Sequence, residues 1–161
     1  MSEAALDAYR ALEASRSTVA TAESLTGGMV GAAITGVPGA SAVYLGGVVA
    51  YATDAKLALL GVSERVLRDH GAVHPDVARQ MARGARDGMS ATFGLAVTGV
   101  AGPEPQDGQP VGTVFAAVAG PAGDVQLAEL HLRGERSEIR EATVDQALRL
   151  LSSVVGAGAS G

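Results

Sequence analysis

The segment STVATAESLTGG, residues 17–28, decides the fold. Its first half, STVATA, has the β-branched side chains and the length of a short buried strand. Its second half, ESLTGG, is expected to open a helix that continues to about Ile34. A strand that passes through a glycine-rich turn into a helix is typical of layered α/β proteins, so this segment predicts an α/β fold.

The spacing of apolar residues, together with Gly and Pro residues that mark turns, predicts the remaining helices and strands. The last two expected strands are joined by the turn GPAG and should form a hairpin. Early strand–helix alternation followed by a hairpin predicts a mixed, mostly parallel sheet with helices on both faces. We expect one domain over residues 1–156 and a frayed Gly/Ala/Ser tail at 157–161. The expected elements are a helix around Leu6, Tyr9 and Leu12, a strand at 44–51, short helices after Asp54 and Ser63, a helix from Pro75, strands at 94–100, 111–119 and 124–132, and a helix over about 135–155.

Composition excludes several classes of function. The 161 residues carry a net charge of −5, with arginines scattered along the chain, which argues against nucleic acid as the main partner. The chain has no cysteine, and His70 and His74 lack a third ligand nearby, so we expect no metal site. No apolar run approaches the ~18 residues of a membrane span, and the first residues lack signal-peptide features. We therefore expect a cytoplasmic protein without a membrane partner.

Polar residues follow three of the expected strands. Ser24 comes after the first strand, Tyr51 and Lys56 after the second, and Thr98 lies near the end of the strand at 94–100. In open α/β sheets, ligands bind beyond the carboxyl ends of the parallel strands. If these strands are parallel, the four side chains share one edge of the sheet, and that edge is the candidate site.

Lys56 is the only lysine, whereas eleven arginines carry the rest of the positive charge. With Asp54 as N-cap it would lie at about the second helical position, where the helix dipole and partial burial lower the pKa of a lysine. A neutral lysine can act as general base for a serine, which an arginine cannot do. The alternative is an ordinary surface lysine. Two serines, Ser24 and Ser41, compete as its partner, and their spacing does not decide between them.

Two glycine-rich loops are candidate substrate-binding loops. The turn containing Thr26, Gly27 and Gly28 either holds a phosphate on backbone N–H groups or serves close helix packing. The loop GVAGPEPQDGQP, which contains Gly99 and Gly102, is either a binding loop or a simple connection.

Five motifs in order, TAESLTGG, GGVVAYATDAK, HGAVHPDVARQMARGAR, TGVAGP and PVGTVF, resemble the CinA C-terminal domain family over about residues 4–155. The resemblance implies a three-layer α/β/α sandwich and a Ser/Lys amidohydrolase without metal or cofactor, which converts nicotinamide mononucleotide to nicotinate mononucleotide and ammonia. By position it implies Ser41 as nucleophile, Lys56 as general base and Tyr51 as a third catalytic residue. The substrate-binding residues that we expect are Ser24, Thr26, Gly27, Gly28, Thr98, Gly99, Gly102 and Arg136, with Arg140 as the alternative to Arg136.

The sequence departs from the family pattern at Leu25, at His74, in YATDAK and in the short loop PEPQDGQPVG, and these changes bear on substrate recognition. We expect an amidohydrolase that acts on a pyridine nucleotide and forms a homo-oligomer, with a dimer favoured. One alternative is a non-catalytic module that binds a pyridine nucleotide or a competence-related partner. Another is hydrolysis of a different amide.

Overall fold

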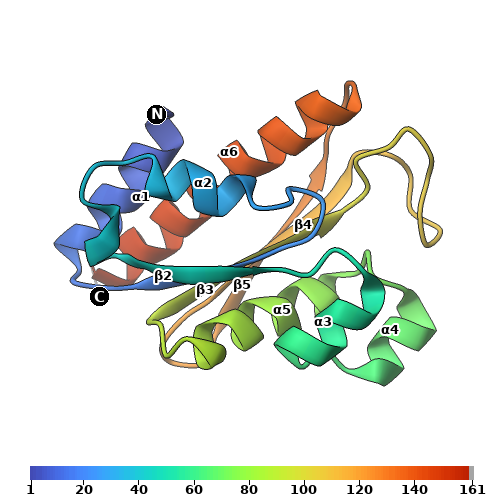
Figure 1. Ribbon diagram of the computed structural model, residues 1–161, viewed down its shortest axis with the longest axis horizontal. Helices are drawn as coiled ribbons and strands as arrows, with labels where there is room; N and C mark the ends of the chain where they lie inside the picture. Colours follow the sequence, from blue (N-terminus) through green and yellow to red (C-terminus); the bar gives the residue numbers. More distant parts are fainter. Residues whose placement is uncertain (160–161) are drawn as a thin grey trace.

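The computed structural model describes residues 1–159, which form five strands, six α-helices and one short 3₁₀ helix (Figure 1). In chain order these are α1 (Glu3–Ala14), β1 (Val19–Glu23), α2 (Met29–Thr35), η1 (Ala40–Ala42), β2 (Tyr44–Val49), α3 (Thr53–Leu60), α4 (Glu64–His70), α5 (Pro75–Gly88), β3 (Phe93–Gly99), β4 (Thr113–Ala119), β5 (Val125–His131) and α6 (Arg136–Ala159).

Several boundaries differ from the sequence-based expectation; strand β2, for example, ends at Val49 and not at Tyr51. Helix α3 begins at Thr53 with Ala52 as N-cap, so Lys56 is the fourth helical residue rather than about the second. Strand β4 starts at Thr113, directly after Gly112, whose φ of 91° is incompatible with a continuous strand. Helix α6 continues through Ala159, so residues 157–159 of the expected frayed tail are helical, and residues 160–161 lie outside the described residues.

The five strands form one mixed sheet in the order β2-β1-β3-β4-β5. Strand β1 pairs in parallel with both β2 and β3, whereas β4 is antiparallel to β3 and to β5. Glu23 at the end of β1 lies level with Val49 of β2 and Val97 of β3. The three parallel strands therefore end together, and the segments that follow them meet at one edge of the sheet.

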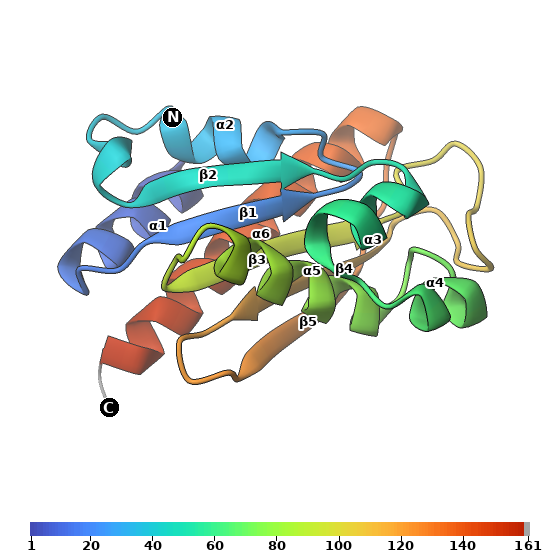
Figure 2. The ribbon, with the colours of Figure 1, turned by 60° about the horizontal axis from the view of Figure 1, so that its bottom comes forward.

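Helices cover both faces of the sheet and make three layers, as Figures 1 and 2 show from two directions. Helices α1, α2 and α6 pack on one face over a core rich in Val, Leu and Ala. Helices α3, α4 and α5 lie on the other face, where α5 crosses β1, β3 and β4. The three-layer α/β/α sandwich with a mixed sheet is thus confirmed.

Two glycines allow α5 to approach its neighbours closely. A Cβ atom at Gly94 would collide with the backbone carbonyl of Ala82 in α5, and one at Gly84 would collide with that of Leu60 in α3. Because Gly84 fixes the packing of α3 on α5, it also fixes the helix that carries Lys56. No helix within residues 1–159 combines the length and apolar character that crossing a membrane requires.

Candidate active site

Lys56 is a buried lysine, with 1% of its surface exposed. Its Nζ donates hydrogen bonds to Ser24 Oγ at 2.9 Å, to the Ala50 carbonyl at 2.8 Å and to the Tyr51 carbonyl at 3.2 Å. Ala50 and Tyr51 directly follow β2, so the backbone at the carboxyl end of this strand holds the amine against Ser24. The alternative of an ordinary surface lysine is therefore wrong.

Burial lowers the pKa of Lys56 from 10.5 to about 8, and the attraction of the Asp107 carboxylate opposes this shift. Within residues 1–159, Lys56 has no carboxylate within 4.0 Å of its Nζ. The expected direction of the pKa shift is confirmed. Its main cause is burial, because the nearby partners are neutral and Lys56 lies one full turn inside α3.

The three acceptors around Nζ also suit the neutral amine. A carbonyl oxygen can only accept, so the two hydrogens of a neutral amine would go to Ala50 and Tyr51. The lone pair then faces Ser24 Oγ, which has its own hydrogen to donate. Loss of one proton from Lys56 thus converts it from a donor to Ser24 into an acceptor from Ser24, which is what a general base requires.

Ser24 is the first residue after β1. Its backbone N–H donates to the Val97 carbonyl of β3, and its carbonyl accepts from the Gly27 N–H, so its backbone is fixed on both sides. Its side chain lines a pocket of about 110 Å³ that opens at the carboxyl edge of the sheet. With 8% of its surface exposed, Ser24 is close to both solvent and the buried lysine.

Ser41 does not approach Lys56 in this chain. It lies in η1 before β2, whereas Lys56 follows the same strand. The six residues of β2 span about 20 Å at the usual rise of a strand. The expected pairing of Ser41 with Lys56 is therefore not formed, because the length of β2 separates them. Ser24 is the serine that contacts Lys56 instead.

The glycine-rich turn before α2 is occupied by the protein's own carboxylate. Glu23 Oε1 accepts from the Val30 N–H at 2.8 Å and the Gly28 N–H at 3.2 Å, and Oε2 accepts from the Gly31 N–H at 3.0 Å. These are the donors that a phosphate would need at this helix N-terminus. These donors are already used by Glu23, which favours the alternative that the turn serves close helix packing.

Two threonines expected at the site have structural partners instead. Thr26 is fully buried, and its hydroxyl donates to Glu23 Oε1 at 2.6 Å. Thr98 is 1% exposed and its hydroxyl donates to the Ala72 carbonyl at 2.8 Å. Neither side chain lines the pocket beside Ser24. Thr26 steadies the turn, and Thr98 anchors the segment before α5 to β3.

The rim of the pocket is formed by Tyr51 and Arg136. Arg136 donates from Nη2 to the Tyr51 hydroxyl at 3.0 Å and from Nη1 to the Gly102 carbonyl. Gly99 and Gly102 contribute backbone to the pocket wall. The phenol of Tyr51 is largely exposed, so its side chain lies at the mouth while its carbonyl holds Lys56.

Arg140 has a different position from Arg136. Its Nε donates to the Leu25 carbonyl at 2.9 Å and its Nη2 to the Thr26 carbonyl at 3.4 Å. Arg140 thus ties α6 to the turn after Ser24, whereas Arg136 lines the pocket.

Five residues that line the pocket were not predicted as site residues: Leu25, Val100, Ala101, Glu104 and Gln106. Leu25 follows Ser24 directly. Glu104 and Gln106 belong to the loop after β3, and their signal in the sequence was the presence of polar side chains in a loop that follows a parallel strand.

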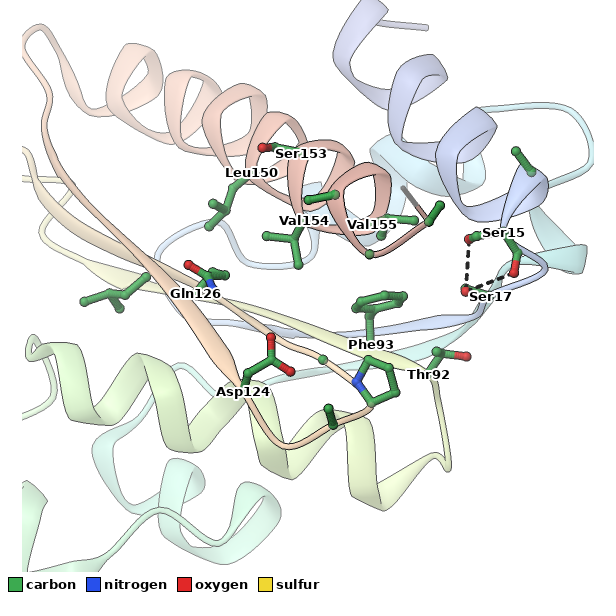
Figure 3. Close-up of a pocket in the computed structure, with 18 residues that line it drawn as sticks. Ser15, Ser17, Thr92, Phe93, Asp124, Gln126, Leu150, Ser153, Val154 and Val155 are labelled. Carbon is green, nitrogen blue, oxygen red and sulfur yellow. Dashed lines mark hydrogen bonds between the residues drawn. The ribbon is translucent and has the colours of Figure 1, made fainter. Parts of the chain in front are cut away.

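A second, larger cavity of about 1070 Å³ lies at the opposite edge of the sheet (Figure 3). It is bounded by the end of α6 and by the turn between β4 and β5, with Phe93 at its floor and Ser15, Asp124 and Gln126 around it. Its lining contains no lysine, arginine or histidine. We therefore assign the candidate active site to the smaller pocket, which is lined by Ser24, the hydrogen-bond partner of Lys56.

The histidines fulfil local roles. His74 is the N-cap of α5 and accepts from the Asp76 N–H at 3.1 Å, and its ring stacks on His70 with centroids 4.1 Å apart. In the part of the chain that the structure describes, no three His, Cys, Asp or Glu side chains form a group that could hold a metal ion.

The fold and the site define a class: three-layer α/β/α domains with a buried lysine at the carboxyl edge of the sheet. The chain belongs to the CinA family, since the model of the CinA C-terminal domain matches residues 2–155. This confirms the resemblance seen in the sequence motifs.

Curated relatives and solved structures agree with this assignment. A CinA-like protein of Frankia casuarinae is 49% identical over 134 residues, and a putative competence-damage inducible protein of Halothermothrix orenii is 44% identical over 135 residues. The matches cover 83% of this chain and 31% and 33% of those proteins, so the chain spans about a third of their length. The crystal structure of competence/damage inducible protein CihA from Agrobacterium tumefaciens has a TM-score of 0.89 at 39% identity, with 96% of both chains covered. A CinA superfamily protein from Klebsiella pneumoniae has a TM-score of 0.91 at 31% identity, covering 95% of this chain and 96% of its own.

Proposed function

We propose that this protein is an amidohydrolase that removes ammonia from the carboxamide of nicotinamide mononucleotide, with Ser24 as nucleophile and Lys56 as general base. The reaction class and substrate follow from the family resemblance. The assignment of the nucleophile follows from one observation: Ser24 Oγ lies 2.9 Å from Lys56 Nζ, whose other two partners are carbonyl oxygens.

The reaction begins when neutral Lys56 takes the proton of Ser24 as the serine oxygen attacks the carboxamide carbon. Lys56 then delivers that proton to the departing nitrogen, which leaves as ammonia, and an ester between the acyl group and Ser24 remains. Water attacks this ester with Lys56 again as base, and the proton returns to Ser24 as the carboxylic acid leaves. Atoms balance over the cycle: one amide and one water give one acid and one ammonia.

The negative charge that develops on the carboxamide oxygen needs hydrogen-bond donors. The N–H of Leu25, the residue after the nucleophile, has no hydrogen-bond partner within residues 1–159 and borders the pocket. A nucleophilic serine whose following N–H stabilises the oxyanion is a recurring arrangement in hydrolases. One such donor contributes roughly 3 to 4 kcal/mol of transition-state stabilisation.

The substrate would favour the reactive state of the base. The nicotinamide ring of the nucleotide is a pyridinium cation, which withdraws electrons from the amide and disfavours a second positive charge nearby. A pKa of about 8 for Lys56 in the free protein would therefore fall further when the ring is bound. The proposed substrate and the buried lysine thus support each other chemically.

Ammonia release from nicotinamide mononucleotide tests the proposal. We expect steady release by the wild type and none above background by Ser24→Ala, with nicotinate mononucleotide as the second product. Tight calorimetric binding of the nucleotide by the wild type without any ammonia would instead support a non-catalytic binding module. If the protein hydrolyses another carboxamide from a substrate panel but not this nucleotide, its substrate is a different amide.

A further inference from the structure

The pocket beside Ser24 contains one acidic and one basic side chain at its mouth, Glu104 and Arg136. Glu104 lies in the loop after β3, five residues beyond the last residue of that strand. Arg136 is the first residue of α6. The two charges therefore come from different elements that meet over the same small cavity.

Neither of these charges is neutralised within the described residues. Arg136 donates to the Gly102 carbonyl and to the Tyr51 hydroxyl, which are neutral acceptors, and it has no carboxylate within 4.0 Å. Glu104 takes part in no hydrogen bond and no ion pair within residues 1–159. Both charges remain available to a ligand.

We infer that this pocket selects a zwitterionic substrate, in which Glu104 faces a cationic ring while Arg136 faces an anionic group of the same molecule. This inference rests on the proposed function, because the pocket is taken to bind the carboxamide at Ser24. With a volume of about 110 Å³ the pocket holds a carboxamide and part of a ring, and the rest of a nucleotide must lie across its mouth. Glu104 and Arg136 are the charged side chains that it meets there.

The inference separates two forms of one substrate that have nearly the same shape. The oxidised nicotinamide ring is positively charged, and the reduced dihydronicotinamide ring is neutral, while both nucleotides carry the same phosphate. An exposed carboxylate facing a cation changes affinity by up to about fivefold. Glu104 should therefore favour the oxidised nucleotide, whereas Arg136 should act equally on both forms.

The experiment measures binding of both nucleotides by calorimetry in a Ser24→Ala background, which removes turnover but keeps the pocket. We expect the oxidised form to bind about fivefold more tightly than the reduced form. Adding Glu104→Gln should weaken the oxidised form to the level of the reduced form and leave the latter unchanged. The matched control, Glu64→Gln in α4, should alter neither affinity, and raising the ionic strength should reduce the preference only where Glu104 is present.

Two results would overturn the inference: equal weakening of both forms by Glu104→Gln, which indicates a structural role, or an unchanged preference. Its failure is distinct from failure of the proposed function. If the wild type releases ammonia but Glu104→Gln keeps the full preference, only the role of Glu104 is lost. If Glu104→Gln abolishes the preference for the oxidised nucleotide but the wild type releases no ammonia, the hydrolase proposal fails. The inference that Glu104 favours binding of the cationic ring is then retained.

Discussion

Ser24 Oγ and Lys56 Nζ lie 2.9 Å apart, although 32 residues separate them in the chain. Ser24 is held at the end of β1 and Lys56 in the first turns of α3, which follows the neighbouring parallel strand β2. The distance between the two side chains is thus fixed by a strand on the Ser24 side and by a helix on the Lys56 side. The lysine is buried among neutral acceptors, so a chemical role for it depends on the loss of its proton.

Replacing Lys56 by Arg tests whether proton loss is needed. A guanidinium stays charged at any pH that the protein tolerates, so Lys56→Arg should lower kcat by about 10²–10⁴-fold, the usual contribution of a general base. Ammonia release measures the loss, and a urea unfolding curve checks that the variant is folded. Retention of more than a tenth of wild-type activity by a folded variant would place the base elsewhere.

The dependence of kcat/KM on pH should follow the titration of Lys56. Its pKa is about 8, and only the neutral form accepts a proton. We therefore expect kcat/KM to rise about tenfold per pH unit below pH 8 and to level off above it. A profile that is flat between pH 6 and 9 would contradict this expectation.

Asp107→Asn provides a specific check on that profile. The Asp107 carboxylate raises the pKa of Lys56, and it also accepts a hydrogen bond from the Ala72 N–H at 2.9 Å. Asparagine can keep that hydrogen bond through its carbonyl oxygen while it removes the charge. The rising limb of kcat/KM should therefore move to lower pH, and a shift to higher pH would be inconsistent with Lys56 as the titrating group.

Glu23 should be a major contributor to stability at the turn after β1. Glu23→Gln removes the charge and exchanges one acceptor oxygen for a donor, which leaves buried N–H groups of α2 without a partner. We expect a loss of about 3 kcal/mol in the free energy of unfolding, measured in urea. The control Glu129→Gln, on the exposed side of β5, should change it by less than about 0.5 kcal/mol. Similar small effects of both substitutions would mean that Glu23 does not hold the turn.

Local sequence pattern was sufficient for the fold. The strand STVATA, the glycine turn and the following helix were predicted because strand length, β-branched residues and helix spacing are local signals. The burial and the lowered pKa of Lys56 could also be expected from local sequence, since it is the single lysine among eleven arginines and stands just beyond a strand.

To predict which serine contacts Lys56, the order and direction of the strands had to be known. Ser41 and Lys56 lie at opposite ends of the same strand. Because the two ends of a strand are far apart, this position already argued against a contact between the two side chains. The partners of Glu23 are N–H groups only a few residues further along the chain, and their approach depends on the conformation of the turn after β1. The hydrogen bond of Thr98 could not be predicted, because only tertiary packing brings the Ala72 carbonyl close to it. The same holds for Glu104 and Arg136, which approach one pocket from two elements far apart in the chain.

The most direct test of the central claim compares two serine substitutions under identical conditions. Ser24→Ala removes the oxygen beside Lys56, whereas Ser41→Ala alters an exposed residue at the other end of β2. Ammonia release from nicotinamide mononucleotide is the measurement, with the unfolding free energy of each variant as control. The account predicts that Ser24→Ala abolishes release and that Ser41→Ala keeps it within about threefold of the wild type, a change of less than 1 kcal/mol. Full activity in Ser24→Ala together with loss of activity in a folded Ser41→Ala would contradict it.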